Sequence, residues 1–240
     1  MTEAFLTNME IEAARTFLQT ALDCGAQKCM VTLSKSVMDL VGVLDGRVDK
    51  ITHSMDRSVT LALFADGKFG TFSTNKLEDG VREFVEKALE TVRMMAPDSA
   101  RDLPAAERTE KSNKDLKLCC AASYEAMTMQ QRVAKALGGS VFGSHPDILS
   151  EEAEYSDTLT DLCILDSGGT FCRQSETTFD FANEITVRDA SAKVSAYWWD
   201  SARRPDGLDT AAVGREALRC ALEKRGAAIC HGGKMALVAD

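Results

Sequence analysis

The segment spanning residues 58–97 constrains the fold most strongly, because its hydrophobic period changes from that of a strand to that of a helix. Residues 59–74 form two apolar halves joined by Asp66-Gly67, a dipeptide that tolerates the positive φ angles of a two-residue β-turn. Counting outward from this turn sets the cross-strand pairs, which are Phe64 with Phe69, Leu61 with Phe72, and Leu63 with Gly70. The segment therefore predicts a β-hairpin with a defined register.

The same segment continues into a predicted helix. From Leu77 onward, apolar residues recur at steps of three and four until Pro97, which cannot continue a helix. Asn75 is the expected N-cap. A short hairpin cannot bury its own apolar face, so we expect this helix to lie across the sheet that contains the hairpin.

The residues before the hairpin predict the rest of an N-terminal domain. An apolar stripe predicts a helix at 8–23, and apolar runs predict strands at 28–33, 37–44 and 48–52. A second Asp-Gly pair, Asp45-Gly46, is the expected turn between the last two of these strands. We therefore predict an α+β domain over residues 1–104, in which an antiparallel β-meander packs with two helices.

A stretch without apolar periodicity follows this domain. Residues 97–117 hold two of the four prolines and a dense mixture of charges, which is typical of a linker between domains. The alternative is a long solvated loop inside a single domain. Beyond this stretch, Ser123 is the expected N-cap of a helix that ends near Leu137, where Gly138-Gly139 follows.

The second half of the chain is rich in predicted strands, at 159–165, 170–178, 179–188 and 194–199. A helix starting at Asp206 or Asp209 and ending near Lys224 completes a second, β-rich α+β domain over residues 105–226. Residues 235–239 have the composition of a further buried strand. We therefore expect residues 227–240 to begin a truncated C-terminal domain.

Composition excludes several classes of partner. The net charge of −9 and the sequence pI of about 5.0 argue against nucleic acid, because binding phosphates requires clustered Lys and Arg. No apolar run is long enough to span a membrane, and the N-terminus does not have the pattern of a signal peptide. The eight cysteines are scattered without a CxxC motif. We therefore expect a cytoplasmic protein with reduced cysteines and no membrane partner.

The order of these features resembles the TldD/PmbA family, also called modulators of DNA gyrase. The resemblance rests on Gly46, Gly67 and Gly70, on the Ser-Thr-Asn sequence at 73–75, and on the helix, Pro-Asp and Leu-Pro that follow. It extends through the second half, where an Ala-Tyr-Trp-Trp strand end at 196–199 precedes a helix and a Gly-Lys pair. The sequence is most similar to the PmbA branch, also called TldE, over its N-terminal and central domains only.

The resemblance implies a subunit of a metallopeptidase complex that encloses its active site and trims unfolded peptides. The catalytic TldD branch binds zinc through an HExxxH helix, but none of His53, His145 and His231 is followed by Glu. We therefore expect no catalytic or metal-binding residue in this chain, and zinc only in a catalytic partner or a downstream domain. The favoured hypothesis is the N-terminal half of a PmbA/TldE-like subunit that binds a TldD-like subunit, or itself as a homo-oligomer, together with unfolded peptide.

Two alternatives remain open from the sequence. The parent protein could be a TldD-like zinc metallopeptidase whose HExxxH motif lies downstream of Asp240. The chain could also be a non-enzymatic interaction module that stands alone. The downstream reading frame separates the first alternative from the favoured hypothesis, since only a TldD-like parent continues into that motif.

The aromatic and basic residues near position 200 are the candidate contact residues, namely Tyr197, Trp198, Trp199, Arg203 and Arg204. Aromatic and Arg side chains are enriched where peptides or subunits bind, although such a cluster can equally pack a core or a domain interface. Adjacent residues such as Cys230-His231 point in opposite directions, so a shared metal ion is not expected there. The glycine-rich run at 166–170 lacks the Lys and the helix of a phosphate loop and predicts a hairpin turn.

Overall fold

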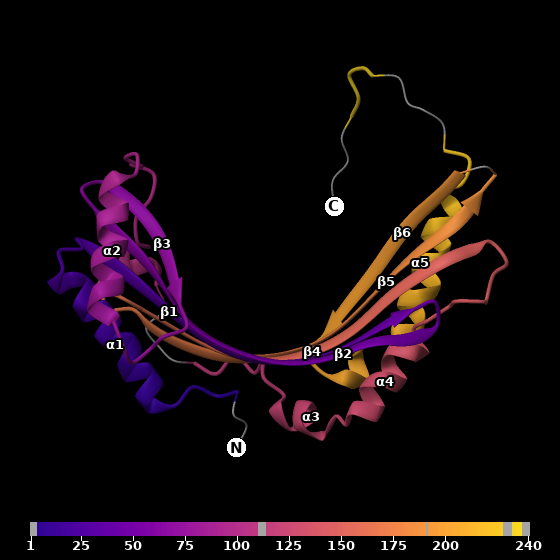
Figure 1. Ribbon diagram of the computed structural model, residues 1–240, viewed down its shortest axis with the longest axis horizontal. Coiled ribbons are helices and arrows are strands. Elements are labelled where there is room, and N and C mark those ends of the chain that lie inside the picture. The colour runs from indigo at the N-terminus through magenta and orange to yellow at the C-terminus, as the bar shows by residue number, and fades with distance from the viewer. Residues whose placement is uncertain (1–3, 110–113, 191, 228–231, 237–240) are drawn as a thin grey trace.

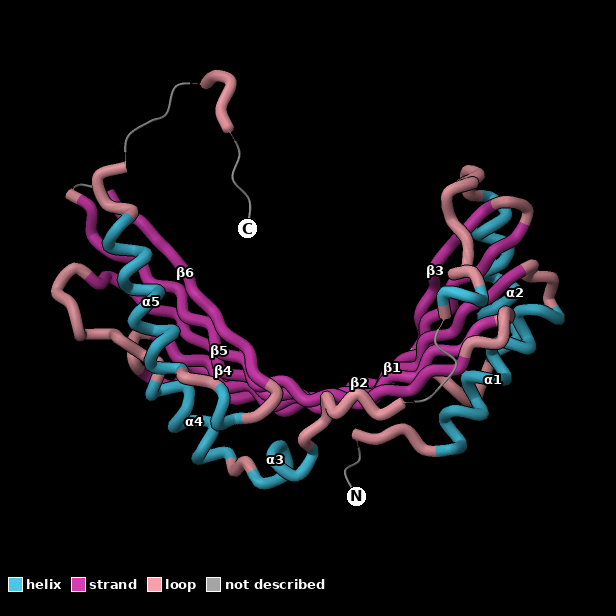
Figure 2. The backbone as a smooth tube through the Cα atoms, turned by 180° about the vertical axis from the view of Figure 1, so that it is seen from behind, coloured by secondary structure: helices cyan, strands magenta, loops and turns pink. Residues whose placement is uncertain are grey.

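The computed structural model describes residues 4–109, 114–190, 192–227 and 232–236. It consists of one six-stranded antiparallel sheet bent into an arch, with the helices along its convex side (Figure 1). The described helices α1 to α5 all lie outside the concave side of the sheet (Figure 2). The strand order across the sheet is β3-β2-β1-β4-β5-β6. The expected α+β class is confirmed.

The elements follow one another in the order α1 (Asn8–Asp23), β1 (Lys28–Leu44), β2 (Arg47–Ala65), β3 (Lys68–Thr74), α2 (Val81–Met94), η1 (Ala106–Arg108), α3 (Ala121–Ala126), α4 (Met129–Gly138), β4 (Ile148–Asp166), β5 (Phe171–Asp189), β6 (Ala192–Ala202), η2 (Pro205–Gly207) and α5 (Thr210–Glu223). Among the described helices, none combines the length and the apolar content needed to cross a membrane.

The strands β1, β2, β4 and β5 are longer than the sequence predicts, because they run without interruption through both arms of the arch. The predicted strands 28–33 and 37–44 are one strand, β1, and the predicted strands 170–178 and 179–188 are one strand, β5. The middle of these strands carries polar residues such as Lys35 and Arg173, which lie where the convex face of the sheet is polar.

Buried charges fill this polar middle of the convex face. Glu10 at the start of α1 binds Lys35 of β1 at 3.1 Å and Arg57 of β2 at 3.0 Å. Farther across the sheet, Arg173 of β5 binds the buried Asp161 of β4 at 2.6 Å. We call these five residues the central network. It holds the N-terminal segment against the middle of the arch, because Asp161 also accepts a hydrogen bond from the backbone N–H of Leu6 at 2.9 Å.

The central network separates the apolar core into parts that lie in the two arms of the arch. In the N-terminal arm, α1 and α2 bury residues such as Phe17 and Leu89 against one end of the sheet. In the C-terminal arm, α3 and α4 cover a cluster that includes Tyr155 and Phe181, and α5 covers a smaller cluster around Ile185. Each arm therefore has its own core beneath a shared sheet.

The turns and the hairpin register agree with the sequence pattern. Asp45, Gly46, Asp66 and Gly67 all have positive φ, between 48° and 74°, as a two-residue type I′ turn requires. The pairs Phe64–Phe69, Leu61–Phe72 and Leu63–Gly70 are observed. A Cβ on Gly70 would lie 2.9 Å from Phe72 and 3.0 Å from Val92, so glycine also lets α2 approach the hairpin closely.

Two helix boundaries differ from the prediction. α2 begins at Val81 after Gly80, which has a φ of 71°, and not at the predicted N-cap Asn75. The helix predicted from Ser123 is two helices, because Thr128 and Gln131 form a capping box that starts α4 anew. Of the two predicted starts of the last helix, Asp206 and Asp209, the N-cap of α5 is Asp209, whose side chain accepts a hydrogen bond from Ala212 N–H at 2.9 Å.

The two predicted domains contribute strands to the same sheet. β1 from the first pairs with β4 from the second along almost its whole length, from Met30–Asp166 to Leu44–Glu152. The division into 1–104 and 105–226 therefore stays a prediction about domain boundaries and does not mark a break in the sheet. Of the strand predicted at 235–239, Met235 and Ala236 have no regular structure and the remainder lies outside the described residues.

Candidate contact surface

The candidate contact surface lies on β6, the strand at the C-terminal edge of the sheet. Ala196 is buried against α5, and side chains alternate along a strand, so Trp198 shares its convex side. Tyr197 and Trp199 consequently face the concave side, where they are 64% and 59% exposed. Two large aromatic side chains therefore stand open on the inner surface of the arch.

Carboxylates lie beside these aromatic residues on the same face. Glu184 of β5 is the cross-strand partner of Tyr197, and Glu152 of β4 lies directly opposite Glu184. Like charges in this position weaken a sheet, and within the described chain neither Glu152 nor Glu184 has an ion-pair partner, whereas Glu154 binds Lys50 at 3.0 Å. Such a surface suits basic side chains, which can contact both aromatic rings and carboxylates.

The edge of β6 adds a second way to bind a chain. β6 pairs with β5 from Ala192 to Ala202, and in the described ranges no strand pairs with its other side. The Lys224 ammonium donates to the carbonyl of Ser195 at 2.9 Å. An end strand presents backbone N–H and C=O groups that an extended peptide or another strand can bind.

The structure separates the five predicted contact residues. Tyr197 and Trp199 lie together on the concave face, and Trp198 lies on the opposite side at 45% exposure. Arg203 and Arg204 follow the end of β6, where Arg204 Nε donates to the sulfur of Cys120 at 3.3 Å. The two arginines therefore belong to a different site from the aromatic pair. The core-packing interpretation does not describe Tyr197 and Trp199, whose rings are open to solvent.

A buried ionic network that the sequence did not predict lies beneath α4. Arg132 is 5% exposed, and its Nε donates to both carboxylate oxygens of Asp157 at 3.0 Å, while its Nη2 lies 3.1 Å from Asp39 Oδ2. Its Nη1 donates to the carbonyl of Met127. Asp39 and Asp157 are direct neighbours on β1 and β4, so one guanidinium bridges two adjacent strands. We call Asp39, Arg132 and Asp157 the C-terminal network.

Tyrosines and a histidine complete the hydrogen bonding of this network. Tyr155 donates to Asp157 at 3.0 Å and Tyr124 to Asp39 at 3.1 Å, and burial raises the pKa of both phenols. His53 Nδ1 lies 2.8 Å from Asp39 Oδ1. Burial also raises the pKa of Asp157 to about 6, because the loss of water outweighs the opposing effect of Arg132. The Arg132 contacts link α4 directly to two strands of the sheet.

A weak sequence signal for this network exists. Asp39 and Asp157 lie two residues along their strands from the buried core residues Val41 and Leu159, so their side chains are on the same, inward side of the sheet. A charged residue at an inward position is expected to have a buried partner. The sequence does not say which cation supplies it, because Arg132 comes from a separate helix.

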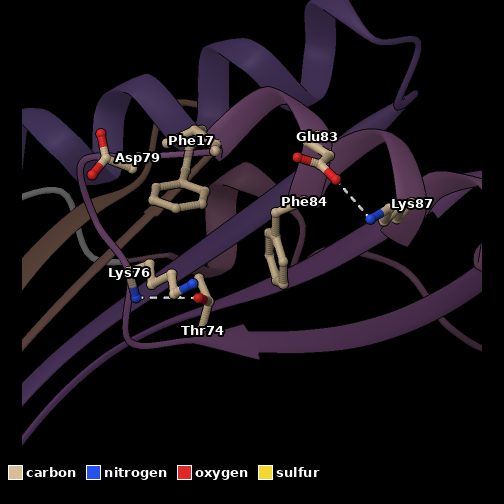
Figure 3. A pocket seen from close by; sticks show the side chains of 9 residues that line it. Phe17, Thr74, Lys76, Asp79, Glu83, Phe84 and Lys87 are labelled. Carbon is tan, nitrogen blue, oxygen red and sulfur yellow. Dashed lines mark hydrogen bonds and ion pairs between the residues drawn. The ribbon is translucent and has the colours of Figure 1, made fainter.

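A cleft between α1 and α2, of about 400 Å³, is shown in Figure 3. Phe17 and Phe84 meet edge to face within its walls, with ring centroids 6.2 Å apart. Glu83 and Lys87 at its rim bind each other at 2.7 Å. The rings account for the packing of α2 on α1, and the charges of this rim pair satisfy each other.

The structure describes no metal site. Across the described ranges, no group of three or more His, Cys, Asp or Glu side chains is placed to hold a metal ion. Cys230 and His231 lie outside the described residues. The run at 166–170 is the β4–β5 hairpin turn, in which Asp166 accepts hydrogen bonds from the N–H groups of Gly168 and Thr170 at 2.7 and 3.0 Å.

This chain is similar to known proteins in part of its sequence and in most of its fold. Residues 29–92, which run from β1 to α2, match the family model described as PmbA/TldA metallopeptidase domain 1. A solved structure of a proposed modulator of DNA gyrase from Bacteroides thetaiotaomicron is similar over 92% of this chain, at 27% identity and a TM-score of 0.80. The comparison with curated proteins gave no significant match.

Two further solved structures share the fold at lower identity. A proposed modulator of DNA gyrase from Thermotoga maritima has 18% identity and a TM-score of 0.65, over 93% of this chain and 50% of its own. TldE from Thermococcus kodakarensis has 15% identity and a TM-score of 0.63, over 86% of this chain and 46% of its own.

This chain spans about half the length of each of these solved structures, including 51% of the Bacteroides thetaiotaomicron protein. The matched range of the family model covers the hairpin and helix that the sequence singled out. Residues 29–92 are therefore similar to the first domain of the PmbA/TldA metallopeptidase family, and the chain shares its fold with modulator of DNA gyrase and TldE proteins.

Proposed function

We propose that this chain is the N-terminal half of a PmbA/TldE-like subunit in a TldD/TldE-type metallopeptidase complex, where it supplies scaffold and subunit contacts. The observation that carries the proposal is the exposed pair Tyr197 and Trp199 on the concave face of β6. Exposed aromatic side chains grouped on an ordered strand mark binding surfaces more often than free surface. The similarity of residues 29–92 to the first domain of the PmbA/TldA metallopeptidase family supports this class of complex.

Unfolded peptide is the substrate that this surface fits. The outer side of β6 offers backbone groups to an extended chain, and folded substrates offer few such groups. Glu152 and Glu184 beside the aromatic pair favour peptides with basic residues. A second subunit could bind through the same edge, so we propose that peptide and partner meet at this end of the arch.

Catalysis belongs elsewhere in the proposed complex. The described residues do not fit a zinc site, and no step of peptide hydrolysis is assigned to them. We propose that a TldD-like partner holds the metal and the general base. In this arrangement the present chain shapes the enclosed space and selects what enters it.

Co-purification tests the proposal. The full-length protein, expressed with the TldD-like protein of the same organism, is expected to elute as one complex that cleaves unfolded peptides. Each subunit alone is expected to be inactive. Elution of the two proteins as separate species, or full peptidase activity in the present protein alone, would contradict the proposed role. An HExxxH motif in the downstream reading frame would support a TldD-like parent instead.

A further inference from the structure

A pocket of about 490 Å³ lies at the end of β6, away from the aromatic pair. Its walls come from the segment before α3 and from the residues between β6 and α5, and they include Lys117, Cys120, Ala202, Arg203, Arg204 and Asp206. Three cations line it in a chain whose net charge is −9. This local concentration of positive charge is the opposite of what the composition leads one to expect.

Thr177 of β5 holds the two walls of the pocket in a fixed relation. Its side chain is fully buried and accepts a hydrogen bond from Cys120 N–H at 3.0 Å while donating to the carbonyl of Arg203 at 3.0 Å. Its own N–H donates to the carbonyl of Leu118 at 3.2 Å. The cysteine and the arginines are therefore positioned by the sheet itself.

The charges in the pocket are only partly neutralised. Lys117 binds Asp115 at 2.7 Å, and Arg204 lies near Asp206 as well as donating to the sulfur of Cys120. Arg203 is exposed, and no side-chain partner for its guanidinium occurs among the described residues. An anion entering the pocket would therefore find the Arg203 guanidinium and the Cys120 thiol among the groups that line the same cavity.

Two other cysteines provide an internal comparison. Cys24 lies 3.5 Å from Arg82 Nη1 and Cys220 lies 3.5 Å from Arg219 Nη2, and both thiols are half-buried like that of Cys120. Arg82 and Arg219 are already bound to glutamates of their own helices. Cys120 in contrast lines a pocket that also contains Arg203.

We propose that this pocket is a thiol-modification site, in which Arg203 and Arg204 hold an anionic low-molecular-weight disulfide of the glutathione class against Cys120. The Cys120 thiol loses its proton to solvent, and its sulfur attacks one sulfur of the bound disulfide. The disulfide bond of the small molecule breaks as a new one forms to Cys120. The other half leaves as a thiolate with the electron pair, so the small disulfide is the oxidant.

The test compares two small disulfides on the 240-residue protein. Dithiobis(nitrobenzoate) carries two negative charges, whereas dithiodipyridine is neutral, and peptide mass spectrometry after quenching gives the rate at each cysteine. We expect the ratio of anionic to neutral rates at Cys120 to exceed the ratios at Cys24 and Cys220 by about tenfold or more. Added salt is expected to reduce this difference, because it screens exposed charges.

Substitutions separate the pocket from the thiol contact. Arg203→Gln leaves the Arg204–Cys120 contact in place. We expect it to lower the ratio of anionic to neutral modification rates at Cys120 about threefold or more. Arg215→Gln, at an exposed position on α5, is the matched control and is expected to leave the ratio unchanged. Equal ratios at all three cysteines, or a Cys120 ratio that Arg203→Gln and salt do not change, would overturn the proposal. Modification by glutathione disulfide itself at Cys120 ahead of Cys24 and Cys220 would support it.

Discussion

The central network and the C-terminal network both bury carboxylates on the convex face, but their cations differ in access to water. The Arg132 side chain is 6% exposed and is enclosed by α4 and the sheet. The side chain of Arg173 is 29% exposed and that of Arg57 is 39% exposed. Removing one member of a buried ion pair lowers the free energy of unfolding most when the charge that remains cannot reach solvent. The two networks should therefore respond differently to the same kind of mutation.

The largest expected effect is in the C-terminal network. Arg132→Met leaves Asp39 and Asp157 buried without a cation, and we expect a loss of about 3–5 kcal/mol in the free energy of unfolding. Urea denaturation followed by circular dichroism measures it. Arg219→Met on the surface of α5 is the control, for which we expect no measurable change in stability, because its ion pairs are exposed to solvent. Equal losses in the two variants would show that Arg132 is not a structural cation.

The pH dependence of stability should have opposite signs in the two networks. Burial alone would raise the pKa of Glu10, but hydrogen bonds from Thr7, Arg57 and Lys35 lower it to about 2, from 4.5. Its contribution is therefore present above pH 4.5 and is lost as the pH falls toward 2. Asp157, raised from 3.8 to about 6, binds its proton more tightly in the folded state. Its contribution therefore decreases as the pH rises from about 4 through 6.

Two variants isolate these contributions. The midpoint of urea denaturation is measured between pH 3 and 7. In Glu10→Gln, we expect this midpoint to depend less on pH below 4.5 than in the wild type. In Asp157→Asn, we expect the wild-type decrease in stability between pH 4 and 6 to be absent. Each removed pKa unit corresponds to about 1.4 kcal/mol. Parallel pH profiles for wild type and Asp157→Asn would mean that Arg132 keeps Asp157 ionised throughout.

Removing the anion of the central network is expected to cost less than removing the cation of the C-terminal one. Asp161→Asn loses the ion pair with Arg173, but that guanidinium can turn toward water, so we expect a loss of about 1–3 kcal/mol. Hydrogen exchange at Leu6 should rise as well, because its N–H donates to Asp161. An unchanged exchange rate at Leu6 would argue against the central network as the anchor of the N-terminal segment.

The smallest effect is expected on the exposed face of α2. Glu83→Gln removes an ion pair between side chains that are each 72% exposed. Fully exposed pairs of this kind at i, i+4 contribute little to stability, because water and salt screen the charges. Thermal unfolding should therefore be almost unchanged, and a shift as large as that of Asp161→Asn would remove the distinction between buried and exposed pairs.

Local sequence patterns predicted the parts of the fold that depend on neighbouring residues. The Asp66-Gly67 turn set the hairpin register because both of its residues accept positive φ, and the stripe of α1 gave its bounds directly. The pattern failed where distant residues decide. The predicted break between residues 33 and 37 was wrong, because Lys35 pairs with Glu10 of a helix that is distant in the sequence. The start of α4 was missed although its signal is local, since Thr128 and Gln131 form a capping box.

The candidate site could be predicted only in part, because its exposure and its contacts depend on residues that are distant in the sequence. The aromatic run at 197–199 is visible in the sequence, but exposure depends on α5 covering only the side of β6 that holds Ala196. The separation of Arg203 and Arg204 from the aromatic pair follows from where β6 ends. The pairing of Arg204 with Cys120 joins residues far apart in the chain, for which no local period gives a signal.

The two sides of β6 provide the most direct test of the proposed contact surface. The affinity of the full-length protein for its TldD-like partner can be measured by isothermal titration for wild type, for a Tyr197→Ser and Trp199→Ser double variant, and for Trp198→Ser. We expect the concave double variant to bind about tenfold or more weakly, a loss of about 1.4 kcal/mol or more, and Trp198→Ser to bind like wild type. Equal affinity of the double variant and wild type, or an equal loss in Trp198→Ser, would contradict the account.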